Sequence, residues 1–284
     1  MFLHKSNPRS LARRMLFAVA VACLLSGLAT PSSALNLGSL VEKVRSAGFR
    51  DQVAAPVALP GGRGFSECTR LFPLQVPLSL ASVDPSWKPF ALCSNHFAVL
   101  YSGLSKTPLV VVEKLSQQQM ADAKDEQRTE QFFPDPRLPG GARAELSDFA
   151  GSGLDRGHLA PAGDQPDAES MAQSFALSNM IPQDPTNNRK IWSKVEKDVR
   201  KFARRAEGAV FVFSGPIFAG QRRTIGANRV WVPSAMFKLV YDEASGRSWA
   251  YVLPNTPDAR IDAPMAYQDF VRATGWKLLS ARMQ

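Results

Sequence analysis

The chain has 284 residues, of which 45% are hydrophobic and 21% are charged. These fractions are ordinary for a globular protein and exclude disorder as the default, and the length fits one large domain or two small ones. The net charge of +9 at pH 7 includes four basic residues and no acidic ones in residues 1–34, so the remainder carries about +5. Such a charge suits a polyanionic partner, but a solvated basic surface is the commoner explanation.

Residues 1–34 have the pattern of a secretory signal peptide. Basic residues precede the apolar run from Met15 to Leu25, and Ser32-Ser33-Ala34 supplies small side chains for cleavage before Leu35. The run is short for a membrane span and is followed by Ser26-Gly27, which argues against a transmembrane anchor. We therefore expect an exported protein, periplasmic or extracellular, with no stable membrane association after cleavage.

Residues 35–85 are rich in proline and glycine and show little periodicity, which predicts an N-terminal arm of unassigned role that wraps the rest of the protein. Cys68 lies in this arm and Cys93 follows it, and beyond the expected signal peptide the chain has no other cysteine. In an exported protein an even pair favours a disulfide, Cys68–Cys93, and two free buried thiols are the alternative.

Regular structure is predicted to begin with a β-hairpin. The β-rich runs 96–101 and 109–113 are separated by Ser102-Gly103 and Thr107-Pro108. His96 stands at the head of the first run, where a structural role is more plausible than that of a ligand.

The next notable segment is Asp155-Arg156-Gly157-His158, which is framed by glycines and is read as a loop. It gathers an acid, an arginine and a histidine, and His96 is the only other histidine beyond the expected signal peptide. Because a general base near neutral pH is most often histidine, His158 is the leading candidate.

A short helix is predicted within 168–178, then a loop over 179–186, and then a long amphipathic helix from about Asn188 to Glu207 that Gly208 stops. On a helical wheel, Asn188 lies in line with the apolar stripe, Glu196 lies at its margin, and lysines and arginines occupy the opposite side. Asn188 could simply cap the helix, and Glu196 could simply pair with Arg200.

Beyond this helix, three strand-like runs are predicted at 209–213, 229–242 and 248–253, the second of them interrupted by Pro233, and a small helix within 270–279 closes the chain. Strands before, helices between and strands after predict an α+β fold with a mixed or antiparallel sheet, and not a βαβ series.

Together the candidate residues suit phosphodiester hydrolysis. A neutral His158 can take a proton from attacking water, and Arg156 can bind a phosphate, although a structural salt bridge is its alternative. The Asn188 carbonyl can hold a hard cation such as Mg²⁺ together with phosphate oxygens. A zinc site would need more clustered His or Cys ligands, and no Gly-x-Ser-x-Gly or Walker motif is present.

Two blocks of the sequence resemble the signatures of the DNA/RNA non-specific endonucleases of the ββα-metal superfamily, which include secreted bacterial nucleases and mitochondrial endonuclease G. The first block is Asp155-Arg156-Gly157-His158 with Ala160-Pro161. The second is Asn179-Met180-Ile181-Pro182-Gln183, followed by Asn188, Trp192 and Glu196 at the family's intervals. The similarity covers roughly Phe97 to Leu279, within an expected nuclease domain of residues 86–284.

The resemblance implies a ββα-metal motif with His158 as general base, Asn188 as protein ligand of Mg²⁺ (or Mn²⁺ in its place), and Arg156 and Glu196 as supporting catalytic residues. Asn179 and Gln183 match positions that shape the site, and Arg128 is the nearest candidate for the family's upstream substrate-binding arginine.

The expected function is metal-dependent endonucleolytic hydrolysis of DNA and RNA with little sequence preference, since phosphate contacts carry no base information. A non-catalytic nucleic-acid-binding protein on the same fold, or a phosphodiesterase for small or lipid substrates, is the alternative. The basic side of the long helix is read as a solvated face.

Overall fold

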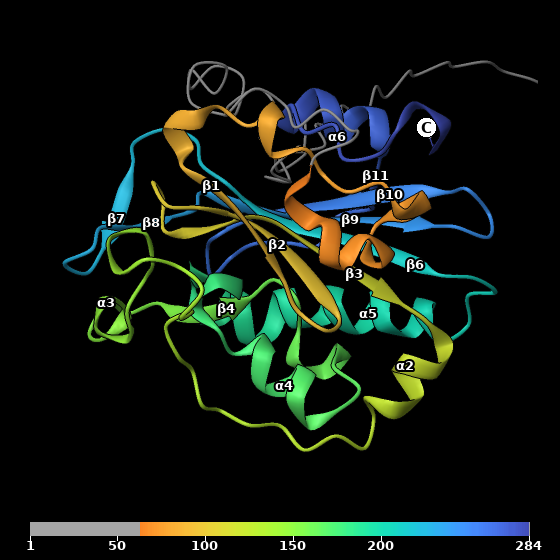
Figure 1. Cartoon of the computed structure of the whole chain (residues 1–284), viewed down its shortest axis with the longest axis horizontal. Helices are drawn as coiled ribbons and strands as arrows, with labels where there is room; N and C mark the ends of the chain where they lie inside the picture. The colour runs from red at the N-terminus through yellow and green to blue at the C-terminus, as the bar shows by residue number, and fades with distance from the viewer. Residues whose placement is uncertain (1–62, 284) are drawn as a thin grey trace, which may run out of the picture. The chain divides into compact units, whose positions relative to one another are not determined.

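A seven-stranded antiparallel sheet forms the centre of the computed structural model, which describes residues 63–283. The strands lie in the order β1-β2-β3-β6-β9-β10-β11 (Figure 1). Their bounds are β1 Pro89–Cys93, β2 Phe97–Ser102, β3 Thr107–Leu115, β6 Val210–Ile217, β9 Ala235–Asp242, β10 Ser248–Pro254 and β11 Met265–Ala266.

Two smaller antiparallel pairs stand outside this sheet: β4 (Asp155–His158) with β5 (Met180–Gln183), and β7 (Arg223–Ile225) with β8 (Val230–Val232). The α-helices are α2 Gln117–Asp122, α3 Leu146–Phe149, α4 Ala168–Ser174, α5 Ser193–Ala203 and α6 Tyr267–Thr274. Everything from α2 to α5 is inserted between β3 and β6, which are neighbours in the sheet.

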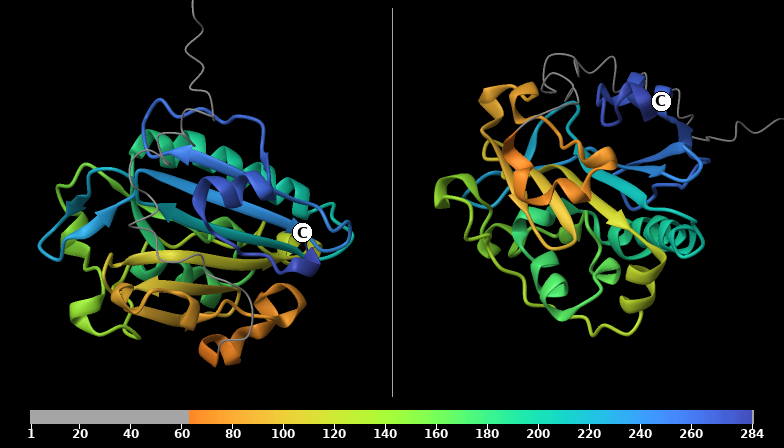
Figure 2. Two further views of the ribbon diagram at one scale, coloured as in Figure 1. Left: turned by 90° about the horizontal axis from the view of Figure 1, so that it is seen from above. Right: turned by 45° about the vertical axis from the view of Figure 1, so that its right-hand side comes forward.

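Both faces of the sheet are covered. The helix α6 lies on one side, and α2, α4 and α5 lie on the other, as Figures 1 and 2 show. Strands β2, β6 and β9 are therefore buried along their whole length, as expected of strands enclosed on both faces. On the α6 side Phe237 packs against Phe270, and on the α5 side Trp192, Val195 and Val199 enter the core.

The expected α+β class with an antiparallel sheet is confirmed. The predicted hairpin is β2–β3, and Pro108 lies inside β3 at the register shift between Leu100 and Tyr101 instead of in the turn. The predicted strand 229–242 is broken at Pro233 into β8 and β9, because proline cannot donate to the ladder. Strand β1 was not predicted.

The described part of the N-terminal arm, from residue 63, consists of short 3₁₀ turns, including Arg63–Leu71. The arm contributes Phe65, Leu71 and Phe72 to the core. The disulfide Cys68–Cys93 is present, with its Cα atoms 5.7 Å apart, and joins the arm to the end of β1. The expected signal peptide and the arm before residue 63 lie outside the described residues.

The long amphipathic helix expected over Asn188 to Glu207 is not a single α-helix. A π-helical segment, Asn187–Trp192, comes first, and the α-helix α5 covers Ser193–Ala203. The π turn widens the backbone where Asn188 sits, and such irregular turns occur frequently at functional sites. The wheel predicts the apolar stripe of α5 correctly, since Val195, Val199 and Ala203 are buried.

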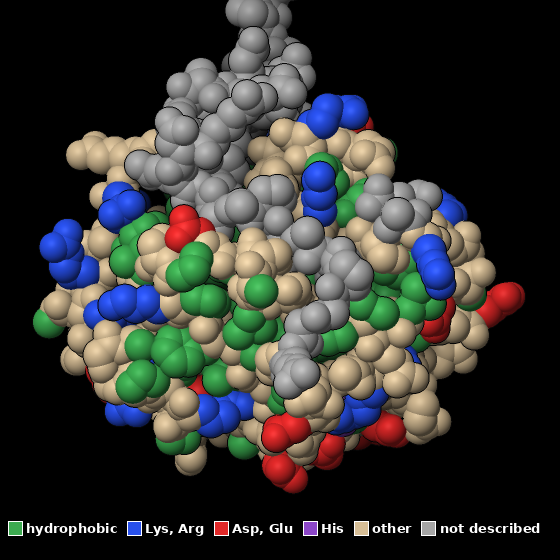
Figure 3. Space-filling view, turned by 45° about the horizontal axis from the view of Figure 1, so that its top comes forward, with side chains coloured by type: hydrophobic (Ala, Val, Ile, Leu, Met, Phe, Trp, Pro, Cys, Tyr) green, Lys and Arg blue, Asp and Glu red, His purple; other side chains and the backbone are tan. Residues whose placement is uncertain are grey.

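Within residues 63–283, no helix combines the length and the apolar character that crossing a membrane requires. Seen from the side that carries α6, apolar side chains are interspersed with lysines and arginines (Figure 3).

Candidate active site

The segment that holds His158 is a strand and not the expected loop. Strand β4 pairs with β5, so that Gly157 lies opposite Ile181 and His158 opposite Met180. A Cβ atom at Gly157 would stand 1.9 Å from Oε1 of Gln183, so only glycine fits there. The predicted loop 179–186 correspondingly contains β5. The two strands followed by the helical segment from Asn187 form a ββα unit.

An open pocket of about 630 Å³ brings together all the candidate catalytic and substrate-binding residues: Arg128, Arg156, His158, Asn188 and Glu196. Further cations line it as well, namely Arg189, Lys197 and Arg200. The excess of positive charge makes the pocket suitable for an anion such as phosphate. His96 does not belong to this lining, and its Nε2 lies 3.7 Å from a carboxylate oxygen of Asp167.

His158 is buried, with 8% of the residue exposed, between two aromatic rings. The Phe175 ring meets the imidazole edge-on at a centroid distance of 4.8 Å, and Phe132 lies at 5.8 Å. Burial, reinforced by the charge of Arg128, lowers the pKa of His158 from 6.5 to about 3. The imidazole is therefore neutral at pH 7, and its buried Nε2 has no hydrogen-bond partner in the described part of the chain.

Asn188 is held by its amide nitrogen, which donates to Oδ2 of Asp155 at 2.9 Å. Because an ionised carboxylate only accepts hydrogen bonds, this contact fixes the amide orientation and leaves the carbonyl oxygen Oδ1 as the free end. Burial alone would raise the pKa of Asp155, but hydrogen bonds from Arg189 and Asn188 hold that pKa below its usual range.

The capping interpretation of Asn188 is wrong. The residue that caps this helical segment is Asp184, whose side chain accepts from the backbone N–H of Asn187 at 2.9 Å and whose carbonyl accepts from that of Asn188 at 2.8 Å. The Asn188 side chain is thus left available to the pocket.

Glu196 and Arg200 likewise do not form the simple surface pair that their spacing allows. Arg200 instead donates to Asp164, which is almost fully buried, at 2.5 Å. Glu196 faces the pocket, where enclosure by protein raises its pKa to about 7, and the charge of Lys238 opposes this shift. The carboxyl group is therefore close to half protonated at neutral pH.

Buried charges lie behind the pocket wall. Lys238, from the middle of β9, donates to Ser214 at 2.6 Å and to the backbone carbonyl of Leu159, the residue after His158, at 3.3 Å. Burial and the nearby Asp164 raise the pKa of Glu113 well above its usual range. Sequence reasoning missed Asp164, Glu113 and Lys238 as parts of the site. The available signal was a charged residue within an apolar strand, which both Glu113 and Lys238 provide.

Arg156 and Arg128 both lie over aromatic rings. The guanidinium of Arg156 is 4.2 Å from the centroid of Phe132, and that of Arg128 is 5.2 Å from the centroid of Phe175. No ion pair of Arg156 is found among the described residues, so its alternative reading as a structural salt bridge is not supported. The same two phenylalanines therefore support both arginines and His158.

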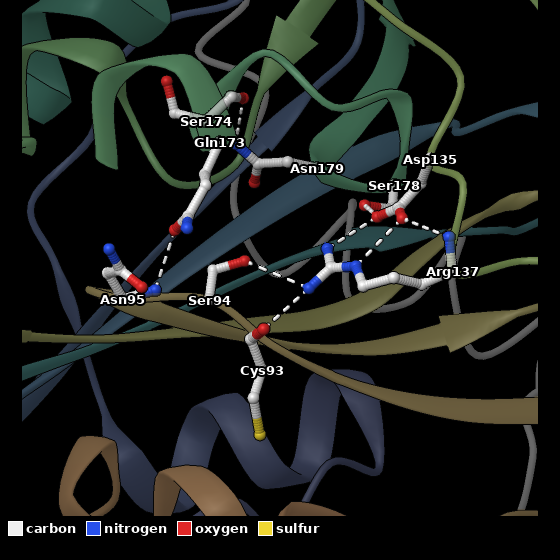
Figure 4. Close-up of polar contacts among 9 residues, drawn as sticks. All are labelled: Cys93, Ser94, Asn95, Asp135, Arg137, Gln173, Ser174, Ser178 and Asn179. Carbon is white, nitrogen blue, oxygen red and sulfur yellow. Dashed lines mark hydrogen bonds and ion pairs between the residues drawn. The ribbon is translucent and has the colours of Figure 1, made fainter. Parts of the chain in front are cut away.

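A polar network ties the loop at Asp135 and Arg137 to the end of β1 and to the residues just before β5 (Figure 4). Arg137 bonds to both oxygens of Asp135 and to the backbone carbonyl of Cys93, and Ser178 donates to Asp135 at 2.5 Å. Asn179 exchanges two hydrogen bonds with the backbone of Ala160, both at 2.9 Å. Asn179 thus holds the chain just beyond His158, in line with the expected shaping role.

The donor set around the pocket indicates which cation would fit. Among residues 63–283, no group of three or more His, Cys, Asp or Glu side chains is arranged to hold a metal ion. The Asn188 carbonyl is an uncharged oxygen donor in the lining of a pocket suited to phosphate. A cation that keeps several waters and takes its other ligands from phosphate, as Mg²⁺ does, fits this arrangement.

Comparison with known proteins places the chain in a family. Residues 82–280 match the family model described as DNA/RNA non-specific endonuclease. The mitochondrial nuclease EXOG of Xenopus laevis is 37% identical over 179 residues, covering 57% of this chain and 49% of that protein. A nuclease of Nostoc sp. is 28% identical over 207 residues, covering 67% and 73%.

Human mitochondrial endonuclease G is 33% identical over 177 residues, which cover 57% of this chain and 59% of that protein. The chain thus spans about half the length of most of the curated relatives it matches. A solved structure of an EndoG/EndoGI complex shares the fold, with a TM-score of 0.62 at 24% identity over 78% of this chain and 92% of that one. Because the family model spans well over half of the sequence, the chain belongs to the DNA/RNA non-specific endonuclease family.

Proposed function

We propose that this protein is an endonuclease that hydrolyses phosphodiester bonds of DNA and RNA, with little sequence preference, in the presence of Mg²⁺ or Mn²⁺. The observation that carries the proposal is the meeting, in one cationic pocket, of His158, whose Nε2 has no hydrogen-bond partner among residues 63–283, and of Asn188, whose amide group Asp155 orients. Family membership supports the same conclusion.

In this mechanism His158 is the general base. Its imidazole is neutral, so a ring nitrogen can accept the proton of a water molecule as the water oxygen bonds to phosphorus and the P–O bond to the leaving oxygen breaks. Burial and the charge of Arg128 lower the pKa of this imidazole to about 3. The negative charge of a phosphate bound nearby would raise that pKa and make the imidazole a stronger base. The packing of Phe132 and Phe175 fixes the ring plane.

Arg156 and Arg128 bind the scissile phosphate in this proposal. Each guanidinium lies over an aromatic ring, which limits its motion. The terminal N–H groups of both arginines can donate to phosphate oxygens, while Nε of Arg128 is paired with Glu130 at 3.8 Å. Such contacts read no base, which accounts for low sequence preference. Glu196, with a pKa of about 7, would orient water inside the pocket by accepting or donating a hydrogen bond.

Asn188 would hold the cation through Oδ1, with Asp155 keeping the amide in the productive orientation. When bound, the ion offsets negative charge that builds up on the phosphate and on the leaving oxygen.

The test is incubation of the purified protein with plasmid DNA and with RNA, in Mg²⁺ or in EDTA. We expect cleavage of both in Mg²⁺ only, and a loss of about 10²-fold or more for His158→Ala. His96→Ala is the matched control, because it removes the histidine outside the pocket. Undiminished cleavage in EDTA would refute the metal role, and normal turnover by His158→Ala would refute the base.

Two further outcomes separate the alternatives. If the wild-type protein binds nucleic acid but cleaves none, it is a binding protein on a nuclease fold. If it cleaves only small or lipid phosphodiesters, the substrate assignment is wrong while the site chemistry stands.

We propose further that the protein is exported to the periplasm or beyond the cell and loses residues 1–34. The Cys68–Cys93 disulfide supports this, since disulfides persist in oxidising compartments. Many of the matched relatives are named as mitochondrial. The mass of the protein recovered from each cell fraction tests the proposal, and an uncleaved cytosolic chain would overturn it.

A further inference from the structure

A second hollow, of about 560 Å³, lies on the other side of α5 from the candidate active site. It is lined by the aromatic side chains of Phe202, Trp249 and Tyr251 and by two arginines, Arg205 and Arg247. We call it the aromatic groove. None of the catalytic candidates belongs to its lining.

The aromatic side chains of the groove are only half-buried. Trp249 and Tyr251 stand two residues apart on β10, so they project from the same face of the strand. Phe202 from α5 meets the indole of Trp249 edge-on at a centroid distance of 4.9 Å. This contact braces one edge of Trp249 and leaves part of the side chain accessible in the groove.

The charges around the groove favour an anionic ligand. Arg205 and Arg247 are both exposed. The groove has one acidic lining residue, Asp198, and that carboxylate is already paired with Lys194 at 3.1 Å and Lys201 at 3.6 Å. Aromatic faces flanked by arginines are the combination that binds unpaired nucleotides, by base stacking and phosphate contact.

The helix α5 connects the groove to the candidate active site. Glu196, Lys197 and Arg200 face the pocket, whereas Asp198, Val199 and Phe202 face the groove. At 100° per residue, the exposed side chains of Lys194 and Lys201 lie between these two sets. Glu196 and Phe202 are separated by roughly 9 Å along the helix axis.

We propose that the aromatic groove is an accessory site for single-stranded nucleic acid, in which an unpaired base stacks on Trp249 or Tyr251 while Arg205 and Arg247 contact flanking phosphates. A strand cut in the pocket would cross the lysines of α5 to reach it. The basic side of α5, expected to be only a solvated face, is in this view part of the substrate path. The inference rests on the proposed function, because it takes nucleic acid as the substrate.

The test uses the double variant Arg205→Gln/Arg247→Gln and measures binding of a fluorescent oligothymidylate of about 20 nucleotides in EDTA by anisotropy. We expect affinity to fall about tenfold or more and the slope of log affinity against log salt to shrink by about 1.4, the value for two lost phosphate contacts on a single strand. The matched control is Lys277→Gln/Arg282→Gln, which removes two exposed charges that follow α6 in the chain.

Trp249→Leu tests stacking independently of charge. We expect it to weaken oligonucleotide binding at least fivefold, and we expect Trp249→Phe, which keeps an aromatic ring, to restore most of the affinity. Circular dichroism confirms that each variant is folded. Hydrolysis of bis(p-nitrophenyl) phosphate, which is too short to reach the groove, should be unchanged in all of them.

The outcomes separate this inference from the proposed function. If the wild-type protein cleaves nucleic acid and the groove variants bind oligonucleotide as tightly as their controls, the accessory site is refuted and the proposed nuclease function is supported. If the wild-type protein neither cleaves nor binds nucleic acid, both fail. An equal loss of affinity for a blunt duplex and for the single strand would overturn the stacking of unpaired bases.

Discussion

Replacing His158 by leucine should change how the stability of the protein depends on pH. The pKa of this histidine is lowered from 6.5 to about 3 in the folded protein, because the ring is buried and lies near Arg128. The unfolded chain therefore takes up a proton below pH 6.5, and the folded chain does so only near pH 3. The contribution of His158 to the unfolding free energy is therefore fully present above pH 6.5 and is lost as the pH falls toward 3.

The size of the effect follows from these two pKa values. Each unit of pH between them costs about 1.4 kcal/mol, so from pH 7.5 to pH 5 the wild-type protein should lose about 2 kcal/mol of unfolding free energy through His158 alone. His158→Leu removes this contribution. The comparison concerns the change between two pH values, so any direct effect of leucine on packing cancels.

Urea unfolding in EDTA, followed by circular dichroism at both pH values, measures the difference. The stability of His158→Leu should fall by about 2 kcal/mol less than that of the wild-type protein. His96→Leu is the matched control. Equal losses for wild type and His158→Leu would show that His158 is not held neutral by burial, and the general-base proposal would lose its electrostatic support.

Three further substitutions test other parts of the site. Glu196→Gln should change the pH dependence in the opposite direction, because folding raises the pKa of Glu196 from 4.5 to about 7. As the pH rises from 5 to 8, the wild type should lose about 2.5 kcal/mol more unfolding free energy than the variant. The same pH dependence in both proteins would contradict this. Gly157→Ala places a methyl group where it would overlap Gln183, so it should lower the unfolding free energy measured in urea by about 1 to 3 kcal/mol. Gly140→Ala is the control, because nothing lies within 4 Å of the added methyl group, and its loss should be far smaller. Arg200→Met should lower the unfolding free energy by about 3 to 5 kcal/mol, because it leaves the Asp164 carboxylate buried without its partner. Adding Asp164→Asn should recover part of that loss. A loss below about 1 kcal/mol for Arg200→Met in urea unfolding would refute the buried ion pair.

The elements predicted best from the sequence were those with strong local patterns. The apolar run in β3 and the break at Pro233 follow from composition and from the chemistry of proline. Strand β4 was missed because its four residues are mostly polar and show no alternation. The π-helical segment at Asn187–Trp192 was missed because a helical wheel assumes regular α geometry.

In the candidate site too, some residues could be predicted from local sequence patterns and others could not. Four of its lining residues, Arg156, His158, Asn188 and Glu196, could be named from two short blocks with fixed spacing. Glu113 and Lys238 could not, because they lie on β3 and β9, far in sequence from the lining residues with which they interact electrostatically. The contact between Asn188 and Asp155 crosses from a strand to a helical segment, and no local pattern encodes it.

The insertion of the whole pocket between β3 and β6 has a consequence for folding. These strands are hydrogen-bonded neighbours, with Leu115 opposite Val210, so their pairing must close a very long stretch of chain. The chain loses conformational entropy when this long loop closes, before the β3–β6 contacts that stabilise the pairing are formed, and this favours slow folding. The ends of the insertion are thereby anchored on central strands, so that substitutions within it can alter the chemistry while the sheet keeps its strand order.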